Sequence, residues 1–175
     1  MKEYLNKYPW LNAYPESDNP VCALRWIPEG WVKAFGDIMC EELDAALRKT
    51  DDYHEAYVVE AKEKYGSLRI HLYPYNDEIF NILLKYECIS QYVCCECGKL
   101  DSPMLNIGGW ISPYCKECYD KLNKDNRHSS FEDVIDGEST IPDVVKWRRC
   151  DETGWHDCEM DIRETVLKIR EKAKL

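Results

Sequence analysis

The apolar positions between residues 31 and 49 recur at steps of three and four, which is the spacing of one buried helix face. Between residues 53 and 73 the period changes to two, with apolar and polar residues alternating on both sides of Lys64-Tyr65-Gly66-Ser67. This alternation predicts two antiparallel strands joined by a tight turn. A second amphipathic helix is predicted to begin at Asn76 or Asp77, because either side chain can cap a helix N-terminus.

The two ends of the chain are patterned less regularly. Residues 1–30 contain four prolines with tryptophan and tyrosine between them, which predicts an irregular arm packed on the body. Residues 116–124 predict a short helix, and residues 125–143 predict a solvated acidic loop. After Asp161 the apolar residues again follow helical spacing, so we expect the chain to end in a helix.

Composition indicates a folded chain with a surplus of negative charge. Of its 175 residues 45% are hydrophobic and 32% are charged, and 23 basic against 33 acidic residues give a net charge of −10. Such a surface repels a polyanion on average, which argues against a nucleic-acid partner. The sequence shows no signal-peptide pattern and no apolar run of membrane-spanning length. We therefore expect a cytoplasmic protein that does not contact a membrane.

Four of the ten cysteines form two C-x2-C pairs, Cys94 with Cys97 and Cys115 with Cys118. Four thiolates supply the tetrahedral soft donors that Zn²⁺ prefers, and they leave no open coordination position for catalysis. The spacing therefore predicts a structural zinc ribbon with Zn²⁺ as the cofactor. Cys95 leaves the identity of the first ligand open, because it can replace Cys94 by making a short C-x-C bite.

Cys150, His156 and Cys158 form a second and weaker group. Three candidate ligands lie within nine residues, but no fourth is evident nearby. The sequence leaves two interpretations open, part of another metal site or packed thiols beside a loop histidine.

We find no assembled catalytic motif. A two-histidine phosphoesterase needs two H-x-[ST] elements, and this chain has one, at His128. An HNH nuclease with a zinc ribbon places a histidine between its cysteine pairs, and residues 98–114 contain none. Glycine-rich phosphate loops and nucleophile elbows are also missing from the sequence. Cys–His catalysis stays open, but we expect a protein that is not an enzyme.

The hairpin turn carries a local group of cations. On the predicted strands Lys62 and Lys64 share one face, and Arg69 returns beside them on the second strand. Cations next to Tyr65 suit a phosphate-bearing ligand with a base that can stack. The alternative interpretation is an ordinary solvated sheet face with basic residues at its edge.

The order of several short motifs resembles a known family. The run from Glu60 to Arg69 is preceded by Gly30-Trp31 and Met39-Cys40, and it is followed by Gly109-Trp110 between the two cysteine pairs. This pattern, over residues 26–120, resembles small zinc-ribbon proteins of phage and prophage genomes with a KEKYGSLR-like hairpin. The resemblance implies zinc binding and a phage context, and it carries over no catalytic residues.

From that resemblance we expect a phage counter-defence protein, an inhibitor acting in the host cytoplasm. It would either sequester a nucleotide-derived immune signal or block a host defence protein. The alternative is a zinc-ribbon adaptor for transcription or nucleic acid, although neither half of the chain is basic.

We expect an α+β fold in which helices flank a small antiparallel sheet. The predicted parts are an α+β body with its N-terminal arm at residues 1–93, a four-cysteine zinc ribbon at 94–124, and an acidic loop and C-terminal helix packed on the body at 125–175.

Overall fold

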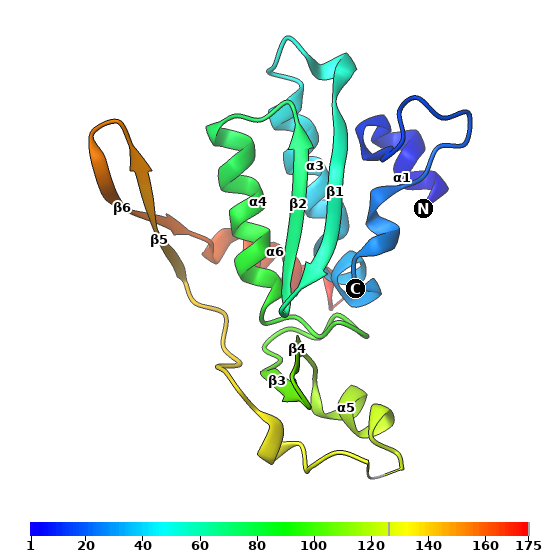
Figure 1. Ribbon diagram of the computed structural model, residues 1–175, viewed down its shortest axis with the longest axis vertical. Coiled ribbons are helices and arrows are strands. Elements are labelled where there is room, and N and C mark those ends of the chain that lie inside the picture. Colours follow the sequence, from blue (N-terminus) through cyan, green and yellow to red (C-terminus); the bar gives the residue numbers. More distant parts are fainter. Residues whose placement is uncertain (126, 175) are drawn as a thin grey trace.

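The computed structural model describes residues 1–125 and 127–174, and Figure 1 shows their arrangement. Its helices are α1 (Lys2–Lys7), α2 (Glu29–Trp31), α3 (Asp37–Leu47), α4 (Asp77–Ser90), α5 (Lys116–Leu122) and α6 (Arg163–Lys172). Its strands are β1 (Tyr57–Lys64), β2 (Ser67–Tyr73), β3 (Met104–Ile107), β4 (Trp110–Pro113), β5 (Val144–Asp151) and β6 (Gly154–Asp161). Within these residues the strands form three separate antiparallel pairs, which confirms the predicted α+β class.

The predicted helix at residues 31–49 is confirmed, and it begins earlier, at Glu29. A π-helical turn, η3 (Val32–Gly36), joins α2 to α3 in one continuous helix. Trp31, Phe35 and Leu43 on its inner face are completely buried. This face packs with α4 against the β1–β2 hairpin and forms the main core (Figure 1).

The turn between β1 and β2 lies where the alternation predicts it. Tyr65 and Gly66 both have positive φ, at 53° and 77°, which is the geometry of a two-residue hairpin turn that matches the strand twist. Lys64 is therefore paired with Ser67. At the start of α4 the side chain of Asn76 accepts a hydrogen bond from the backbone N–H of Ile79, so Asn76 is the cap.

The N-terminal arm is packed on the body, as expected, but it begins with a helix that the sequence pattern did not predict. Helix α1 has six residues and no side-chain cap, so its signal is short. Trp10 is buried, and its Nε1 donates to Asp44 on α3 at 3.1 Å. The hydroxyl of Tyr4 donates to Asp37.

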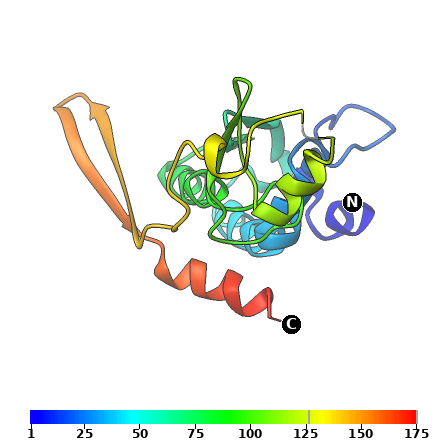
Figure 2. The same cartoon turned by 90° about the horizontal axis from the view of Figure 1, so that it is seen from below.

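The hairpin β5–β6 is a second element that the sequence pattern did not predict. Its charged residues occupy both faces, so the apolar alternation typical of a half-buried strand is missing. Figures 1 and 2 show the hairpin projecting from the body. Helix α6 then returns to the body, where Ile162, Val166 and Ile169 are buried in the main core. No helix among the described residues is long and apolar enough to cross a membrane.

Candidate metal centre

The four predicted thiols come together at one point, beside the start of α5. The Sγ atoms of Cys94, Cys97, Cys115 and Cys118 all lie within 4.8 Å of one another, and those of Cys97 and Cys115 are 3.6 Å apart. These four residues are called the cysteine centre below. They lie close enough to hold a metal ion. Among the described residues, no other group of His, Cys, Asp or Glu side chains does so.

Local backbone geometry directs the first two thiols inward. The chain turns tightly after Cys97 because Gly98 has a φ of 81°, a conformation that glycine adopts without strain. The N–H of Gly98 donates to the carbonyl of Cys94 at 3.0 Å, and the N–H of Cys94 donates to the carbonyl of Lys99 at 2.9 Å. We call residues 94–98 the first knuckle. The second pair is delivered by the start of α5, where Cys115 is the residue before the helix.

The structure resolves the choice between Cys94 and Cys95. Cys94 is fully buried within the cysteine centre, whereas the side chain of Cys95 packs in the main core. Burial raises the pKa of the Cys95 thiol, so this side chain is held as a neutral thiol. Cys94 therefore supplies the first ligand atom of the centre.

The electrostatics of the centre suit a cation. Burial raises the pKa of Cys94, but the backbone N–H groups of Cys97, Cys115 and Glu96 donate to its sulfur and lower it more. The pKa of Cys94 is therefore below that of an ordinary thiol. Burial and the neighbouring thiols raise the pKa of Cys97 and of Cys118. Four sulfurs at this distance carry several negative charges only when a cation lies between them.

The first knuckle is docked on the start of the long helix. The N–H of Gly30 donates to the carbonyl of Cys95 at 2.8 Å, and a Cβ on Gly30 would stand only 2.2 Å from the carbonyl oxygen of Cys94. Nearby, the buried Nε1 of Trp31 donates to the carbonyl of Val93 at 2.8 Å. The centre therefore joins α2 to the chain that leaves α4. Gly30-Trp31 is one of the motifs on which the family resemblance rests. The sequence pattern did not predict that these two residues contact the first knuckle and the residue before it.

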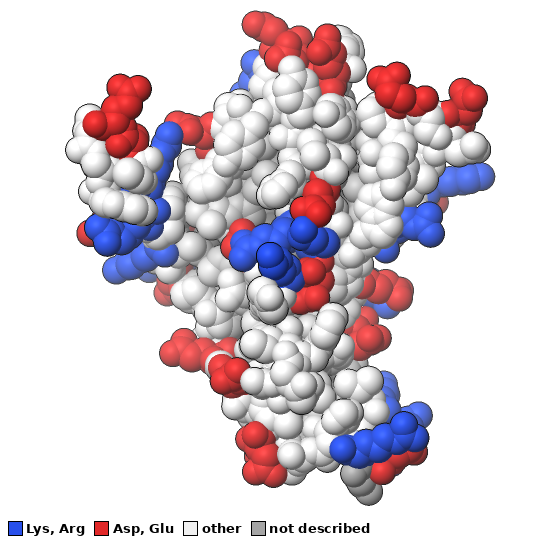
Figure 3. Space-filling view, in the orientation of Figure 1, with Lys and Arg blue, Asp and Glu red and all other residues white. Residues whose placement is uncertain are grey.

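The predicted ligand residues of the β1–β2 hairpin share one face, as Lys62 and Arg69 are cross-strand partners. Lys62 Nζ lies 2.6 Å from Glu60, and Arg69 pairs with Glu87 on α4. Figure 3 shows a basic group over the lower half of β1 and β2 with acidic side chains beside it. Two cations of this predicted site are thus engaged by carboxylates.

The other two predicted residues, Lys64 and Tyr65, lie at the hairpin tip. Tyr65 is 74% exposed, and Lys64 Nζ stands 5.7 Å from the centre of its ring. Both line a pocket of about 280 Å³ together with Trp110 of β4 and the carboxylate of Glu63. The pocket thus offers two aromatic rings, one lysine and one carboxylate, with no excess of positive charge.

The weaker group of Cys150, His156 and Cys158 is not drawn together by the hairpin β5–β6. Cys150 is opposite Trp155 in the register, so its side chain lies on the other face of the hairpin from His156 and Cys158. His156 Nε2 is 2.7 Å from Thr153 Oγ1 instead. These residues are absent from the metal-ligating group found in the described part of the chain.

Comparisons of the chain with protein-family models, with curated proteins and with solved structures return no match.

Proposed function

We propose that the cysteine centre holds one structural Zn²⁺. A tetrahedral site with Zn–S bonds of about 2.3 Å places its sulfurs about 3.8 Å apart. The 3.6 Å between Cys97 and Cys115 and the 4.8 Å limit for all four thiols fit this geometry. Four thiolates complete the coordination, so the ion has no position for a substrate. Its role is to join the first knuckle, α2 and α5.

On this scaffold we propose a binding protein that is not catalytic and blocks a host protein in the cytoplasm of the host cell. The observation that carries the proposal is the projection of β5–β6 from the body (Figures 1 and 2). Within the part of the chain that the structure describes, each of its two strands pairs only with the other, so each has one unpaired edge. The base of the hairpin packs on the main core through Val145, whereas its outer half is exposed on both faces. A two-stranded hairpin without further packing is only marginally stable in water, so this outer half gains stability when a partner covers it.

The side chains at the tip of this hairpin are those that anchor protein interfaces. Trp155 is 65% exposed, and the guanidinium carbon of Arg148 lies 5.2 Å from the centre of its ring. Tryptophan and arginine are enriched among the residues that dominate binding energy. Charged residues lie beside this pair on the same face, with Lys146 on β5 and Asp157 on β6. An aromatic anchor with a charged rim is typical of a protein-binding surface.

The counter-defence context of this proposal comes from the resemblance of residues 26–120 to phage zinc-ribbon proteins. In the other version of that expectation, the β1–β2 hairpin would sequester a nucleotide-derived signal. It receives less support because the pocket beside the hairpin tip is lined by one lysine and one carboxylate and so has no excess positive charge. Blocking of a host defence protein is therefore the version we favour.

The test compares two tryptophans of nearly equal exposure on different hairpins. Trp155 is 65% exposed on β6 and Trp110 is 63% exposed on β4. The tagged chain and its Trp155→Ser and Trp110→Ser variants are expressed in bacteria that carry phage-defence systems, and phage plating and co-purified proteins are measured.

We expect the chain to raise plating on at least one strain and to retain one stoichiometric partner that cross-links to Lys146. Trp155→Ser should abolish both effects, and Trp110→Ser should leave them unchanged. Equal behaviour of the two variants, or no change in plating on any strain, would contradict the proposal. Salt-dependent binding to duplex DNA in a gel shift would instead support the adaptor function.

A further inference from the structure

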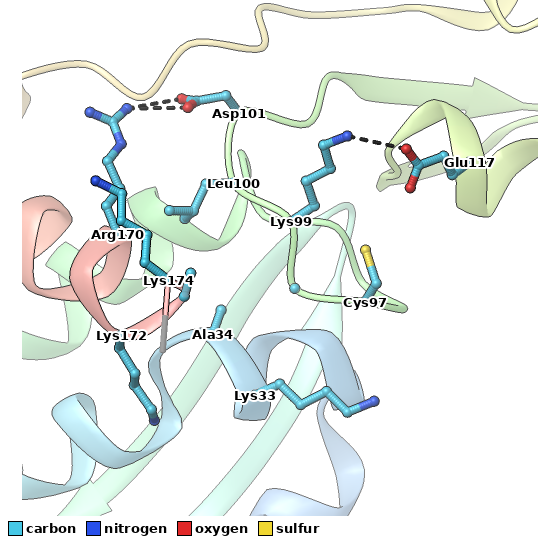
Figure 4. Close-up of a pocket in the computed structure, with 12 residues that line it drawn as sticks. Lys33, Ala34, Cys97, Lys99, Leu100, Asp101, Glu117, Arg170, Lys172 and Lys174 are labelled. Carbon is cyan, nitrogen blue, oxygen red and sulfur yellow. Dashed lines mark hydrogen bonds and ion pairs between the residues drawn. The ribbon is translucent and has the colours of Figure 1, made fainter.

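A pocket of about 680 Å³ lies between the C-terminal end of α6, the π-helical turn η3 and the first knuckle (Figure 4). Four segments of the chain build it, namely residues 33–34, 97–101, Glu117 of α5 and residues 170–174. Five of its lining residues are basic, namely Lys33, Lys99, Arg170, Lys172 and Lys174. Asp101 and Glu117 are its acidic lining residues, and two carboxylates outside the lining, Glu29 and Asp37, pair with Lys33 and Lys172. The five cations therefore face four carboxylates, which leaves the pocket with a local surplus of one positive charge in a chain of net charge −10. We call it the α6 pocket.

The basic groups of the α6 pocket are held by exposed ion pairs. Arg170 lies 3.2 Å from Asp101, and Lys99 lies 3.6 Å from Glu117, as Figure 4 shows. Lys33 lies 2.8 Å from Glu29, and Lys172 pairs with Asp37. Pairs between exposed side chains contribute only about 0–1 kcal/mol, so a ligand with a higher charge can displace these carboxylates. Among the described residues no carboxylate lies within ion-pair distance of Lys174. Within the described chain the pocket thus combines one unpaired ammonium with several cations that exchange partners easily.

The floor of the α6 pocket is formed by small and apolar residues. Ala34 and Leu100 lie between the basic side chains in Figure 4, and Gly98 and Ala173 also line the pocket. Ala34 and Lys33 both belong to η3. Single π-helical turns inside α-helices occur frequently at functional sites. A volume of about 680 Å³ lies within the range of small-molecule binding sites.

We propose that the α6 pocket binds a small ligand that carries two or more phosphate groups. Its cations come from two sides, with Arg170, Lys172 and Lys174 on α6 and just beyond it, and with Lys33 and Lys99 on η3 and next to the first knuckle. Two groups of cations on opposite sides match two separated phosphates better than one. The apolar floor accommodates the uncharged part of such a ligand. This site is distinct from the β5–β6 hairpin, so it does not depend on the proposed function of that hairpin.

The test is calorimetric titration of the full, zinc-loaded chain with inorganic tripolyphosphate, orthophosphate and ATP, without added divalent metal. Lys174→Gln and Lys99→Gln remove lining cations, and Lys168→Gln is the matched control. Lys168 lies on α6, pairs with Glu164 at 2.8 Å and does not line the pocket. None of these side chains is buried, so the variants should fold.

We expect one tripolyphosphate per chain, bound at least tenfold more tightly than orthophosphate. Lys174→Gln and Lys99→Gln should each weaken binding by about tenfold, which is the scale of one charge-assisted hydrogen bond. Lys168→Gln should change it less than about twofold. Three results would overturn the proposal, namely no binding of tripolyphosphate or ATP, equal effects of all three substitutions, and duplex DNA binding that depends on the same lysines.

Discussion

Gly30→Ala tests the docking of the first knuckle on the long helix. An alanine Cβ at this position would stand 2.2 Å from the carbonyl oxygen of Cys94, 2.6 Å from that of Cys95 and 2.7 Å from the backbone nitrogen of Gly98. All three atoms are backbone, so no side-chain rotation relieves the contacts. The knuckle and the helix must separate by about 1 Å to reach ordinary van der Waals distance.

Three effects set the change in the free energy of unfolding that we expect for Gly30→Ala. Forcing a methyl group into a packed region costs about 1–3 kcal/mol, and rigid backbone neighbours place this case at the upper end. The separation also weakens the hydrogen bond from Gly30 to Cys95, worth about 1 kcal/mol. Alanine regains up to about 1 kcal/mol over glycine in a helix. The free energy of unfolding should therefore fall by about 3 kcal/mol.

The measurement is urea unfolding of the zinc-loaded protein, followed by circular dichroism and tryptophan fluorescence. For a chain of this length a loss of about 3 kcal/mol lowers the melting temperature by about 6–12 °C. Gly36→Ala is the control, because its Cβ would meet side-chain atoms of Tyr4 and Val32 at 3.1 and 3.2 Å, which can move. We expect it to cost less than about 1 kcal/mol. If Gly30→Ala is no more destabilising than Gly36→Ala, the knuckle is not docked as described.

Two further predictions concern single buried or bridging groups. Ser90 is fully buried, and its Oγ accepts a hydrogen bond from the N–H of Leu68 at 2.8 Å. Ser90→Ala should therefore lower the free energy of unfolding by about 1–3 kcal/mol and speed hydrogen exchange of the Leu68 amide. Unchanged exchange of this amide would contradict the prediction. Burial raises the pKa of Asp37, but hydrogen bonds from Lys172 and Tyr4 bring it below its ordinary value of 3.8. This stabilisation is complete above pH 3.8 and is lost as the pH falls through the lowered pKa, so the acid-unfolding curve of Asp37→Asn should lack this part of the loss.

Periodicity predicted those elements that have one buried face. The long helix presents Trp31 and Leu43 to the core, so its spacing is visible in the sequence. The alternation predicted both strands of the β1–β2 hairpin, but a bulge between Val58 and Glu60 interrupts it in β1, so Val58 is buried and Val59 is exposed. Hairpin β5–β6 was missed because its outer half is solvated on both faces and its charges hide the alternation. Helix α1 was missed because six residues give too short a signal.

The sequence predicted a candidate site where its residues are close together along the chain, and missed contacts that only tertiary packing creates. The cysteine spacing is local information, and it identified all four residues that converge. The hairpin cations share a face as predicted, but their carboxylate partner on α4, Glu87, is brought there by tertiary packing. The α6 pocket joins residues as distant as Lys33 and Lys174. No pattern along the chain indicates that such residues meet.

The central claim is that a structural zinc ion at the cysteine centre holds this fold together. The direct measurement is metal content by elemental analysis together with the melting temperature before and after chelation, for the unaltered chain and for Cys94→Ser and Cys95→Ser. We expect one zinc per chain, a lower melting temperature after chelation, loss of zinc in Cys94→Ser and full retention in Cys95→Ser. A chain without zinc whose melting temperature is unchanged by the chelator, or a Cys95→Ser variant that loses the metal while Cys94→Ser keeps it, would contradict the account.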